Sequence, residues 1–286
     1  MPDKPQNTGP DAPNLGDLRK DIDRIDETMH RLLMERGQII DRLISVKKTQ
    51  ETGSAFRPAR EADMMRRLVQ RHHGILPLDT AESIWRVIIA TFTHVQSPFA
   101  VHADLSAGDA MMRDSARFHF GFTVPYVPHA GAAGVVEAVS ESKSDLGLVP
   151  AFATDRSGAW WTSLEFESAP KIIARLPFID RPDHPAPLDV FVVSRAAADA
   201  MATEVEMWSV RAENWSADAA RAVSQLSEVI AVPDKAFDGA ALLISVPAGG
   251  EFAAIKAALV KVGVTVCSAA LVGSHATRYK VAAKKP

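Results

Sequence analysis

The sequence predicts a chain of several domains, in which an all-helical N-terminal domain is followed by an α/β segment and then by a small α+β domain. Three observations lead to this prediction. Apolar residues repeat with the helical period from Leu18 to Phe92. After Pro98, short apolar runs alternate with Ala-rich stretches, which is typical of an α/β layer. After Ala202, the pattern fits the order strand, helix, strand, strand, helix, strand.

The first of these domains is expected to open with one long helix over about residues 17–50. Apolar residues recur at spacings of three and four, the period of an amphipathic helix, at Leu18, Ile22, Ile25, Met29, Leu32, Leu33, Ile39, Ile40, Leu43 and Ile44. A lone helix of this length cannot bury its apolar stripe, so it needs a partner, most simply a second copy of itself. The sequence therefore predicts a homodimer intertwined through this helix.

Two shorter helices complete the predicted N-terminal domain. Pro58 fits the first turn of a second helix, which is expected to reach His72. Asp79 or Thr80 is expected to cap a third helix, and Pro98 marks the end of the domain. The predicted boundaries are a disordered leader at 1–14, the helical domain at 15–97, an α/β region at 98–203 and the α+β domain at 204–286.

The back two-thirds of the chain is expected to hold short strands and helices. In the α/β region, strands are predicted at 118–127, 146–149, 172–173 and 190–193, with a helix at 131–140. In the α+β domain, the predicted elements are strand 205–212, helix 216–226, strand 228–232, strand 240–247, helix 249–262 and strand 264–272. Cys267 is expected to be a core residue of the last strand.

Composition and charge restrict the classes of partner. The net charge of −3 argues against nucleic acid, because phosphates require a basic surface. Arg and Lys are concentrated between residues 17 and 73, which suggests a small anionic ligand. A single cysteine excludes a disulfide framework, the N-terminus lacks the apolar segment of a signal peptide, and no apolar run reaches the ~20 residues of a membrane span. We therefore expect a cytoplasmic protein that binds neither nucleic acid nor membrane.

Three cationic residues of the long helix form a candidate binding site. Arg36 and Lys47 are eleven residues apart, which is roughly 16 Å of rise and places them on one face. Arg19 is seventeen residues from Arg36, roughly 25 Å of rise, and lies on a different face. If all three bind one ligand, Arg19 must come from an antiparallel partner. Two arginines and a lysine suit a small dianion, and the alternative is a solvated face that carries surface charge.

Five motifs follow one another in residues 15–97. They are Leu18-Arg19-Lys20-Asp21-Ile22-Asp23-Arg24-Ile25-Asp26, Leu32-Leu33-Met34-Glu35-Arg36, Val46-Lys47-Lys48, Arg57-Pro58-Ala59-Arg60-Glu61, and Ile88-Ile89 followed by Gln96. In order and spacing, this set resembles the all-helical class of chorismate mutases. The resemblance implies a dimeric enzyme of aromatic amino acid biosynthesis that converts chorismate to prephenate by a Claisen rearrangement, without metal or cofactor.

The resemblance also implies a role for each site residue. Arg19 would reach across from the partner chain to one carboxylate of chorismate, and Arg36 would bind a carboxylate from its own chain. Lys47 and Gln96 would hydrogen-bond the ether oxygen whose C–O bond breaks. Glu61 would contact the region of the ring hydroxyl.

Three residues of the implied substrate pocket depart from the family pattern. Met65 stands where some members have a Glu that binds the ring hydroxyl, and Met64 replaces an Arg often found in those members. Phe92 stands where a Ser supports the carboxylate site. These departures affect the expected substrate affinity more than the reaction, because Lys47 and Gln96 are present.

The region after the helical domain looks like part of a prephenate dehydratase followed by an ACT-like domain. Two catalytic motifs of that family are missing, because the chain reads Ala151-Phe152-Ala153-Thr154 and Leu188-Asp189-Val190 at the corresponding places. Asp189 in place of an Arg is expected to repel an anionic substrate. We therefore expect a truncated, inactive dehydratase-like region with a structural or regulatory role. An aromatic amino acid effector is possible in such an architecture, although the family's effector signatures are not visible at 217–223 or 228–234.

Two other functions fit the same sequence. One is a lyase acting on isochorismate or chorismate, since Lys47 and Gln96 do not exclude it. The other is a non-catalytic protein that senses an aromatic-pathway metabolite or binds another enzyme of the pathway, to which the departures at Met64, Met65 and Phe92 give weight.

Overall fold

The structure is a computed structural model, which describes residues 14–47, 54–154, 157–195, 202–234 and 239–282. Contacts within the chain separate it into two units, residues 1–48 and residues 49–286. Of the disordered leader predicted at 1–14, only Asn14 lies within the described residues.

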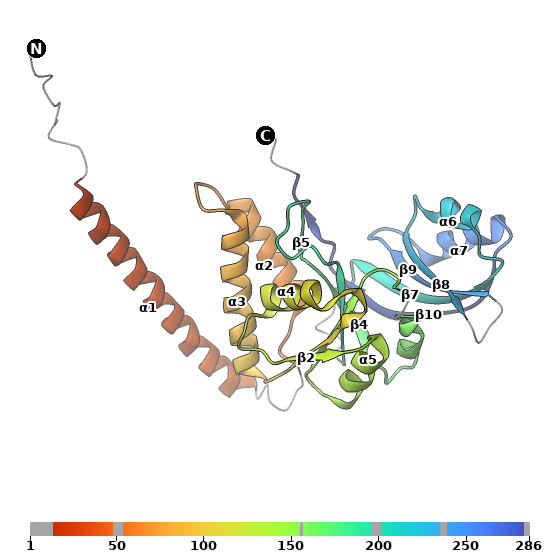
Figure 1. Cartoon of the computed structure of the whole chain (residues 1–286), viewed down its shortest axis with the longest axis horizontal. Coiled ribbons are helices and arrows are strands. Elements are labelled where there is room, and N and C mark those ends of the chain that lie inside the picture. Colours follow the sequence, from red (N-terminus) through yellow and green to blue (C-terminus); the bar gives the residue numbers. More distant parts are fainter. Residues whose placement is uncertain (1–13, 48–53, 155–156, 196–201, 235–238, 283–286) are drawn as a thin grey trace, which may run out of the picture. The chain divides into compact units, whose positions relative to one another are not determined.

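The first unit is a single helix, α1 (Leu15–Lys47), coloured red in Figure 1. Its 33 residues confirm the long uninterrupted helix that the apolar spacing predicts. Asn14 begins the helix, because its side-chain Oδ1 accepts a hydrogen bond from the backbone N–H of Gly16 (2.8 Å). The apolar stripe of α1 is exposed, with Ile22 at 57% and Leu32 at 56%. A helix whose apolar face meets water needs a partner surface.

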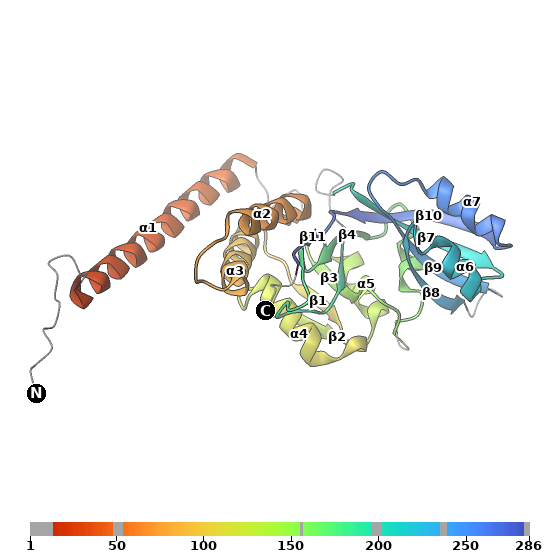
Figure 2. The ribbon, with the colours of Figure 1, turned by 90° about the horizontal axis from the view of Figure 1, so that it is seen from above.

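The second unit is built on a nine-stranded sheet with the order β2-β1-β3-β6-β4-β10-β7-β9-β8 (Figures 1 and 2). Its first half contains β1 (Val101–Asp104), β2 (Tyr126–His129), β3 (Leu146–Pro150), β4 (Lys171–Leu176) and β6 (Val190–Ser194). Strands β2, β1 and β3 run parallel, and β6 pairs antiparallel with both β3 and β4. A separate parallel pair is formed by β5 (Ile179–Asp180) and β11 (Tyr279–Lys280).

Helices α2 (Pro58–Arg71), α3 (Leu78–Gln96) and α4 (Asp109–Phe120) pack on one face of this sheet. Met65 of α2 and Ile89 of α3 belong to the same buried cluster as strand residues such as Leu148. The second and third predicted helices are thus present, but their apolar sides share a core with the α/β region. The third helix begins at Leu78 with Pro77 at its N-cap position, so the cap expected at Asp79 or Thr80 is wrong.

The opposite face of the sheet carries α5 (Ala132–Glu141) and the 3-10 helix η2 (Trp160–Leu164). Another 3-10 helix, η1 (Leu105–Ala107), follows β1. Trp161 is 1% exposed and packs in a second buried cluster with Val135 and Phe191. This cluster continues into β7, β9 and β10, so the α/β region and the C-terminal domain share core contacts as well.

The C-terminal elements appear in the predicted order. They are β7 (Val205–Glu213), α6 (Ala217–Val223), β8 (Glu228–Asp234), β9 (Gly239–Val246), α7 (Phe252–Lys261) and β10 (Thr265–His275). The four strands pair antiparallel, and α6 and α7 contribute Val223 and Leu259 to a third buried cluster with Leu242.

The strand expected at 118–127 is wrong, because α4 continues to Phe120 and β2 begins only at Tyr126. Met112, Ala116 and Phe120 are buried together at the helical spacing of four. That spacing extends the helix through a segment whose composition suggests a strand.

The core position expected for Cys267 is also wrong, because this residue is exposed. It lies in β10 as predicted, but among the described residues the first half of that strand pairs with β7 alone. With no described strand on its other edge, Thr265–Leu271 lies largely in contact with solvent.

Strand β10 joins the two halves of the sheet at one residue. It pairs with β4 only where Gly273 lies opposite Ile172. Gly273 has a φ of 149°, in the positive region that favours glycine. A Cβ at this position would also overlap the backbone of Ile172. The joint therefore requires glycine.

Replacement of Gly273 by Ala should lower the free energy of unfolding by about 3 kcal/mol or more, because strain at positive φ adds to the overlap with Ile172. Gly263→Ala is the matched control, since Gly263 also has positive φ (86°) but a Cβ there meets no atom within 4 Å. The control should cost about 1 kcal/mol. Urea denaturation measures both losses, and equal losses would contradict a tight joint at Gly273.

Candidate functional site

The cations predicted to bind the ligand lie along α1. Arg19 is exposed and Arg36 is half-buried, while Lys47 is the last residue of the helix. The side chain of Lys47 lies outside the described part of the structure. The unbroken helix supports the spacing that puts Arg36 and Lys47 on one face. The convergence of all three cations on one ligand stays a prediction.

Gln96 and Phe92 lie together at the C-terminal end of α3. The Gln96 Nε2 donates a hydrogen bond to the backbone carbonyl of Phe92, one turn earlier (3.0 Å). Both side chains are half-buried. The structure thus brings together two of the residues that the sequence assigns to one site.

Glu61 is held in a buried ion pair. Its Oε2 accepts a hydrogen bond from Nη1 of Arg86 on α3 (2.7 Å), and the two residues are 4% and 0% exposed. Burial raises the pKa of Glu61 above its ordinary value of 4.5, although the Arg86 guanidinium opposes this shift. The carboxylate predicted to contact the ligand therefore also locks α2 to α3.

Arg86 lies outside the sequence motifs that predict the site. A signal is nevertheless present, because Arg86 lies on the same face of α3 as Ile89 and Ala90, which are buried. A charge on an apolar helix face needs a buried partner of opposite sign. A search for that partner among the acidic residues of the neighbouring helix leads to Glu61.

The ion pair belongs to a larger polar cluster between α3, α4 and the loop at 181–184. Arg86 Nη2 donates to the backbone carbonyl of His119 (3.1 Å), and the His119 ring stacks on His184 with 6.0 Å between centroids. His184 Nε2 lies 3.2 Å from Oε1 of Glu82. Burial, together with Arg86 and His184, holds the pKa of His119 well below its ordinary value of 6.5.

Met65 is 1% exposed and packs in the core between α2 and the sheet. It also borders a cavity of about 190 Å³ with Met64, Arg67, Arg71 and Trp85. Two guanidinium groups beside an indole ring are suited to a small anion. Met64 and Met65 belong to the pocket that the sequence predicts, whereas the two arginines do not.

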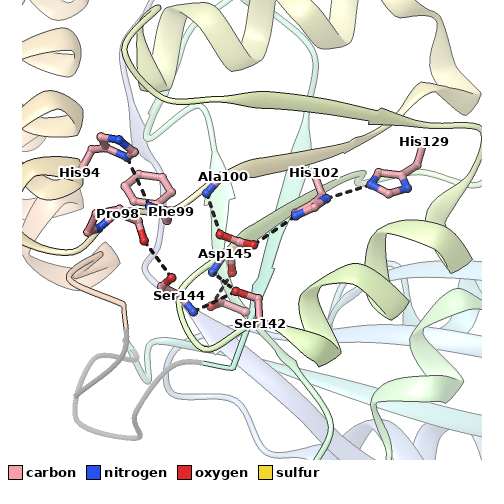
Figure 3. A network of polar contacts seen from close by, with 10 residues as sticks. His94, Pro98, Phe99, Ala100, His102, His129, Ser142, Ser144 and Asp145 are labelled. Carbon is pink, nitrogen blue, oxygen red and sulfur yellow. Dashed lines mark hydrogen bonds and ion pairs between the residues drawn. The ribbon is translucent and has the colours of Figure 1, made fainter. Parts of the chain in front are cut away.

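A row of three polar side chains crosses the parallel strands of the sheet, as Figure 3 shows. His102 Nε2 lies 3.3 Å from Oδ2 of Asp145, and His102 Nδ1 lies 2.9 Å from Nε2 of His129. The other carboxylate oxygen of Asp145 accepts the backbone N–H of Ala100 (2.7 Å). Because a carboxylate only accepts, His102 carries its proton on Nε2 and accepts one from His129 at Nδ1.

This arrangement leaves a lone pair on Nδ1 of His129. Burial and the neighbouring His102 lower the pKa of His129. The row can therefore relay a proton between His129 and Asp145. No motif in the sequence links these three residues, because each comes from a different strand or strand end.

Asp189 does not present an unpaired negative charge, so the repulsion expected from it is wrong. Its two carboxylate oxygens accept hydrogen bonds from Nε and Nη2 of Arg175 (2.9 and 2.6 Å). Arg278 lies 3.4 Å from the same carboxylate. Two guanidinium groups neutralise this position from within the fold.

Comparison with known proteins decides the identity of the helical part. Residues 18–97 match the family model described as chorismate mutase type II. These residues form a chorismate mutase type II domain. The matched range includes Arg19, Arg36, Lys47, Glu61 and Gln96.

The similarity of the chain to whole relatives extends beyond the chorismate mutase domain. The chain is 29% identical over 140 residues to the bifunctional chorismate mutase/prephenate dehydratase of Aquifex aeolicus, which is 48% of this chain and 38% of that protein. It is 29% identical over 145 residues to the enzyme of the same description from Pseudomonas aeruginosa, covering 49% and 39%. The chain thus matches about two fifths of the length of these relatives. The matched stretches are longer than the mutase domain.

Among solved structures, the prephenate dehydratase from Streptococcus mutans is similar, with 14% identity and a TM-score of 0.39. The comparison covers 64% of this chain and 99% of that one. No helix in the described residues has both the length and the apolar character needed to cross a membrane.

The buried His119 predicts a loss of stability in mild acid. The unfolded histidine binds a proton as the pH falls through about 6.5, whereas the folded one stays neutral, so the unfolded state gains protons and stability falls. The free energy of unfolding should drop by about 1.4 kcal/mol per pH unit below pH 6 from this residue.

His119→Leu should make the dependence on pH shallower, as measured by urea denaturation between neutral and mildly acidic pH. His73→Gln, at an exposed position, controls for the loss of a histidine. Parallel pH profiles for the wild type and His119→Leu would show that His119 is not kept neutral in the fold.

Proposed function

We propose that the chain is a chorismate mutase that converts chorismate to prephenate by a Claisen rearrangement. The match of residues 18–97 to chorismate mutase type II carries this proposal, because it contains all four residues of the predicted catalytic set. The relatives from Aquifex aeolicus and Pseudomonas aeruginosa are described as having chorismate mutase activity. The rearrangement is unimolecular, so the site must bind and orient one substrate and needs no nucleophile or cofactor.

The proposed catalytic residues act on the bond that breaks. Lys47 and Gln96 hydrogen-bond the ether oxygen, on which negative charge grows in the transition state. A cation beside that oxygen stabilises the transition state more than the ground state, which raises the rate. Arg36 and Arg19 bind the two carboxylates and hold chorismate in its compact reactive conformer.

The proposed enzyme is a homodimer, and Arg19 reaches the site from the partner subunit. Arg19 and Arg36 are roughly 25 Å apart along α1, too far for one helix to bring both to a small ligand. Antiparallel pairing of two α1 helices would place Arg19 of the partner subunit near Arg36 and Lys47. The exposed apolar stripe of α1 supports this pairing, since a second copy would bury it.

Glu61, Met65 and Phe92 are proposed to line the rest of the substrate pocket. Glu61 can keep its ion pair with Arg86 through Oε2 and still offer a second carboxylate oxygen to a ring hydroxyl. Met65 and Phe92 supply apolar surface where some family members have polar groups. This exchange reduces the number of hydrogen bonds to the substrate and lowers the affinity more than the rate.

The region after the mutase domain is proposed to be a truncated prephenate dehydratase-like region at 98–203 followed by an ACT-like domain at 204–286. The strand and helix order from β7 to β10 supports the ACT-like assignment. The dehydratase motifs are absent at Ala151–Thr154 and Leu188–Val190, so we propose no dehydratase activity. Its role is structural, or regulatory through an aromatic amino acid, and the protein acts in the cytoplasm.

A non-catalytic protein that binds a metabolite of the aromatic pathway is the second candidate. The buried Glu61–Arg86 pair favours it, because this pair leaves a predicted substrate contact only 4% exposed. A binding protein would retain the cationic site without turnover.

Lys47→Ala should lower kcat for the consumption of chorismate by about 100- to 1,000-fold, because it removes the cation beside the developing oxyanion. Lys20→Ala is the matched control, since Lys20 is exposed on the same helix and pairs only locally with Asp17. The control should keep wild-type kcat. Turnover that is unchanged in Lys47→Ala would contradict the site, and no turnover by the wild type would favour the binding protein.

Subunit mixing tests the shared site. Arg19→Ala and Lys47→Ala homodimers should each be nearly inactive, whereas their random mixture should recover about a quarter of wild-type activity, since half the dimers are mixed and each has one intact site. Chorismate consumption after subunit exchange measures the recovery. A mixture that exchanges subunits, as shown by mass spectrometry of tagged chains, but stays inactive would exclude an Arg19 contribution from the partner.

A further inference from the structure

A small cavity of about 190 Å³ lies between α2 and α3. It is bordered by Met64, Met65, Arg67 and Arg71 of α2 and by Trp85 of α3. Met64 and Trp85 pack against the buried cluster that the two helices share with the sheet. Arg67 and Arg71 are exposed. The cavity therefore has an apolar wall that the core holds in place and a cationic rim that solvent reaches.

The two arginines of the rim lie on the same stripe of α2 as Met64. The spacings from Met64 to Arg67 and from Arg67 to Arg71 are three and four residues, which places them on one face of the helix. Long side chains on a helix lean toward its N-terminus, over the preceding turn. Arg67 follows this direction, since its Nε lies 3.0 Å from Oδ2 of Asp63, four residues earlier. The lean therefore carries the guanidinium groups back along the stripe toward Met64.

The positive charge beside the cavity is not neutralised. Arg66 and Arg67 both pair with Asp63, so two guanidinium groups share one carboxylate. The side chain of Arg71 has no hydrogen bond or ion pair with any described residue. Three guanidinium groups against one carboxylate leave a net charge of +2 on residues 63–71. None of the described residues that border the cavity is acidic, so its charge favours a dianion over a zwitterion or a cation.

Trp85 gives the cavity a flat aromatic surface. Its side chain is half-buried and borders the cavity from α3, whereas the two arginines border it from α2. Rings pack against an indole in offset-stacked or edge-to-face contacts. Guanidinium groups bind carboxylates in bidentate fashion. A ligand that fits both features carries its carboxylates on a ring.

The cavity lies apart from the residues proposed for catalysis. Trp85 shares a face of α3 with Phe92 and Gln96, at spacings of seven and four residues. Trp85 and Gln96 are eleven residues apart, which is roughly 16 Å of rise. Neither Phe92 nor Gln96 borders the cavity. A small ligand beside Trp85 therefore leaves Gln96 uncovered, although Met65 borders the cavity and is also proposed to line the substrate pocket.

We propose that this cavity is a second ligand site of the mutase domain and binds a small ring compound with two carboxylates. One carboxylate binds the guanidinium of Arg71, the other lies beside Arg67, and the ring lies against Trp85. A dianion neutralises the net charge of the rim, whereas a single carboxylate neutralises half of it. The proposed substrate belongs to this chemical class, but the inference concerns equilibrium binding outside the catalytic set and does not depend on turnover.

Calorimetric titration of the 286-residue chain at low ionic strength tests the ligand class. The probes are isophthalate, which has two carboxylates on a ring, benzoate, which has one carboxylate on the same ring, and succinate, which has two carboxylates and no ring. Isophthalate should bind ten times or more tightly than either of the others. No binding of isophthalate would overturn the proposal, as would equal binding of benzoate or succinate.

Variants locate the site. Arg67→Gln and Arg71→Gln should each weaken isophthalate binding at least tenfold, and both positions are exposed, so neither change disturbs the core. Arg66→Gln is the matched control, because Arg66 carries the same charge and pairs with the same Asp63 but does not border the cavity. This control should bind as the wild type does. Unchanged affinity in both cavity variants would overturn the site, and an equal loss in all three would show attraction by net charge alone and overturn it too.

Arg36→Gln separates the cavity from the proposed catalytic site. Arg36 is proposed to bind a carboxylate of chorismate, and it does not border the cavity. Isophthalate should bind this variant about as tightly as the wild type. A loss in Arg36→Gln that matches the loss in Arg71→Gln would place the probe at the catalytic site and overturn a second site. Neither titration requires turnover, so an absence of turnover would contradict only the proposed function.

Discussion

The exposed apolar stripe of α1 is the constraint on which the proposed assembly depends. Large side chains such as Ile22, Met29 and Leu32 are about half exposed along a helix of 33 residues. Each square ångström of apolar surface left in water costs about 25 cal/mol, so a second copy of the helix gains stability by covering it. The same pairing would complete the site, because it brings Arg19 of the partner subunit toward Arg36. Folding, dimerisation and substrate binding would then be linked in one equilibrium.

In the second unit, the back of the chain packs against two helices of the mutase domain. Helices α2 and α3 share their core with the sheet, and the Glu61–Arg86 pair and its neighbours tie α3 to α4. Gly273 joins that sheet to the C-terminal strands. Removal of the region after residue 97 would therefore expose Met65 and Ile89. A structural role for this region follows from the shared core, whatever chemistry it has.

Sequence periodicity is sufficient to predict α1, α2 and α3 and the order of the C-terminal elements, because apolar spacing and Pro or Gly at the ends are local signals. It fails at Phe118, where a helix carries aromatic residues, and at Cys267, where exposure depends on which strand lies alongside. The motifs identify the cations of α1 and Gln96. They do not reveal Arg86 or the row from Asp145 to His129, since those contacts form between segments far apart in the chain.

We propose that the chain converts chorismate to prephenate and does not process prephenate further. Proton NMR of chorismate incubated with the purified 286-residue chain identifies the product directly. We predict that prephenate accumulates and persists, at a rate above that of the uncatalysed rearrangement. Phenylpyruvate would contradict the proposed loss of dehydratase activity. Chorismate consumed no faster than without protein would contradict the mutase assignment itself.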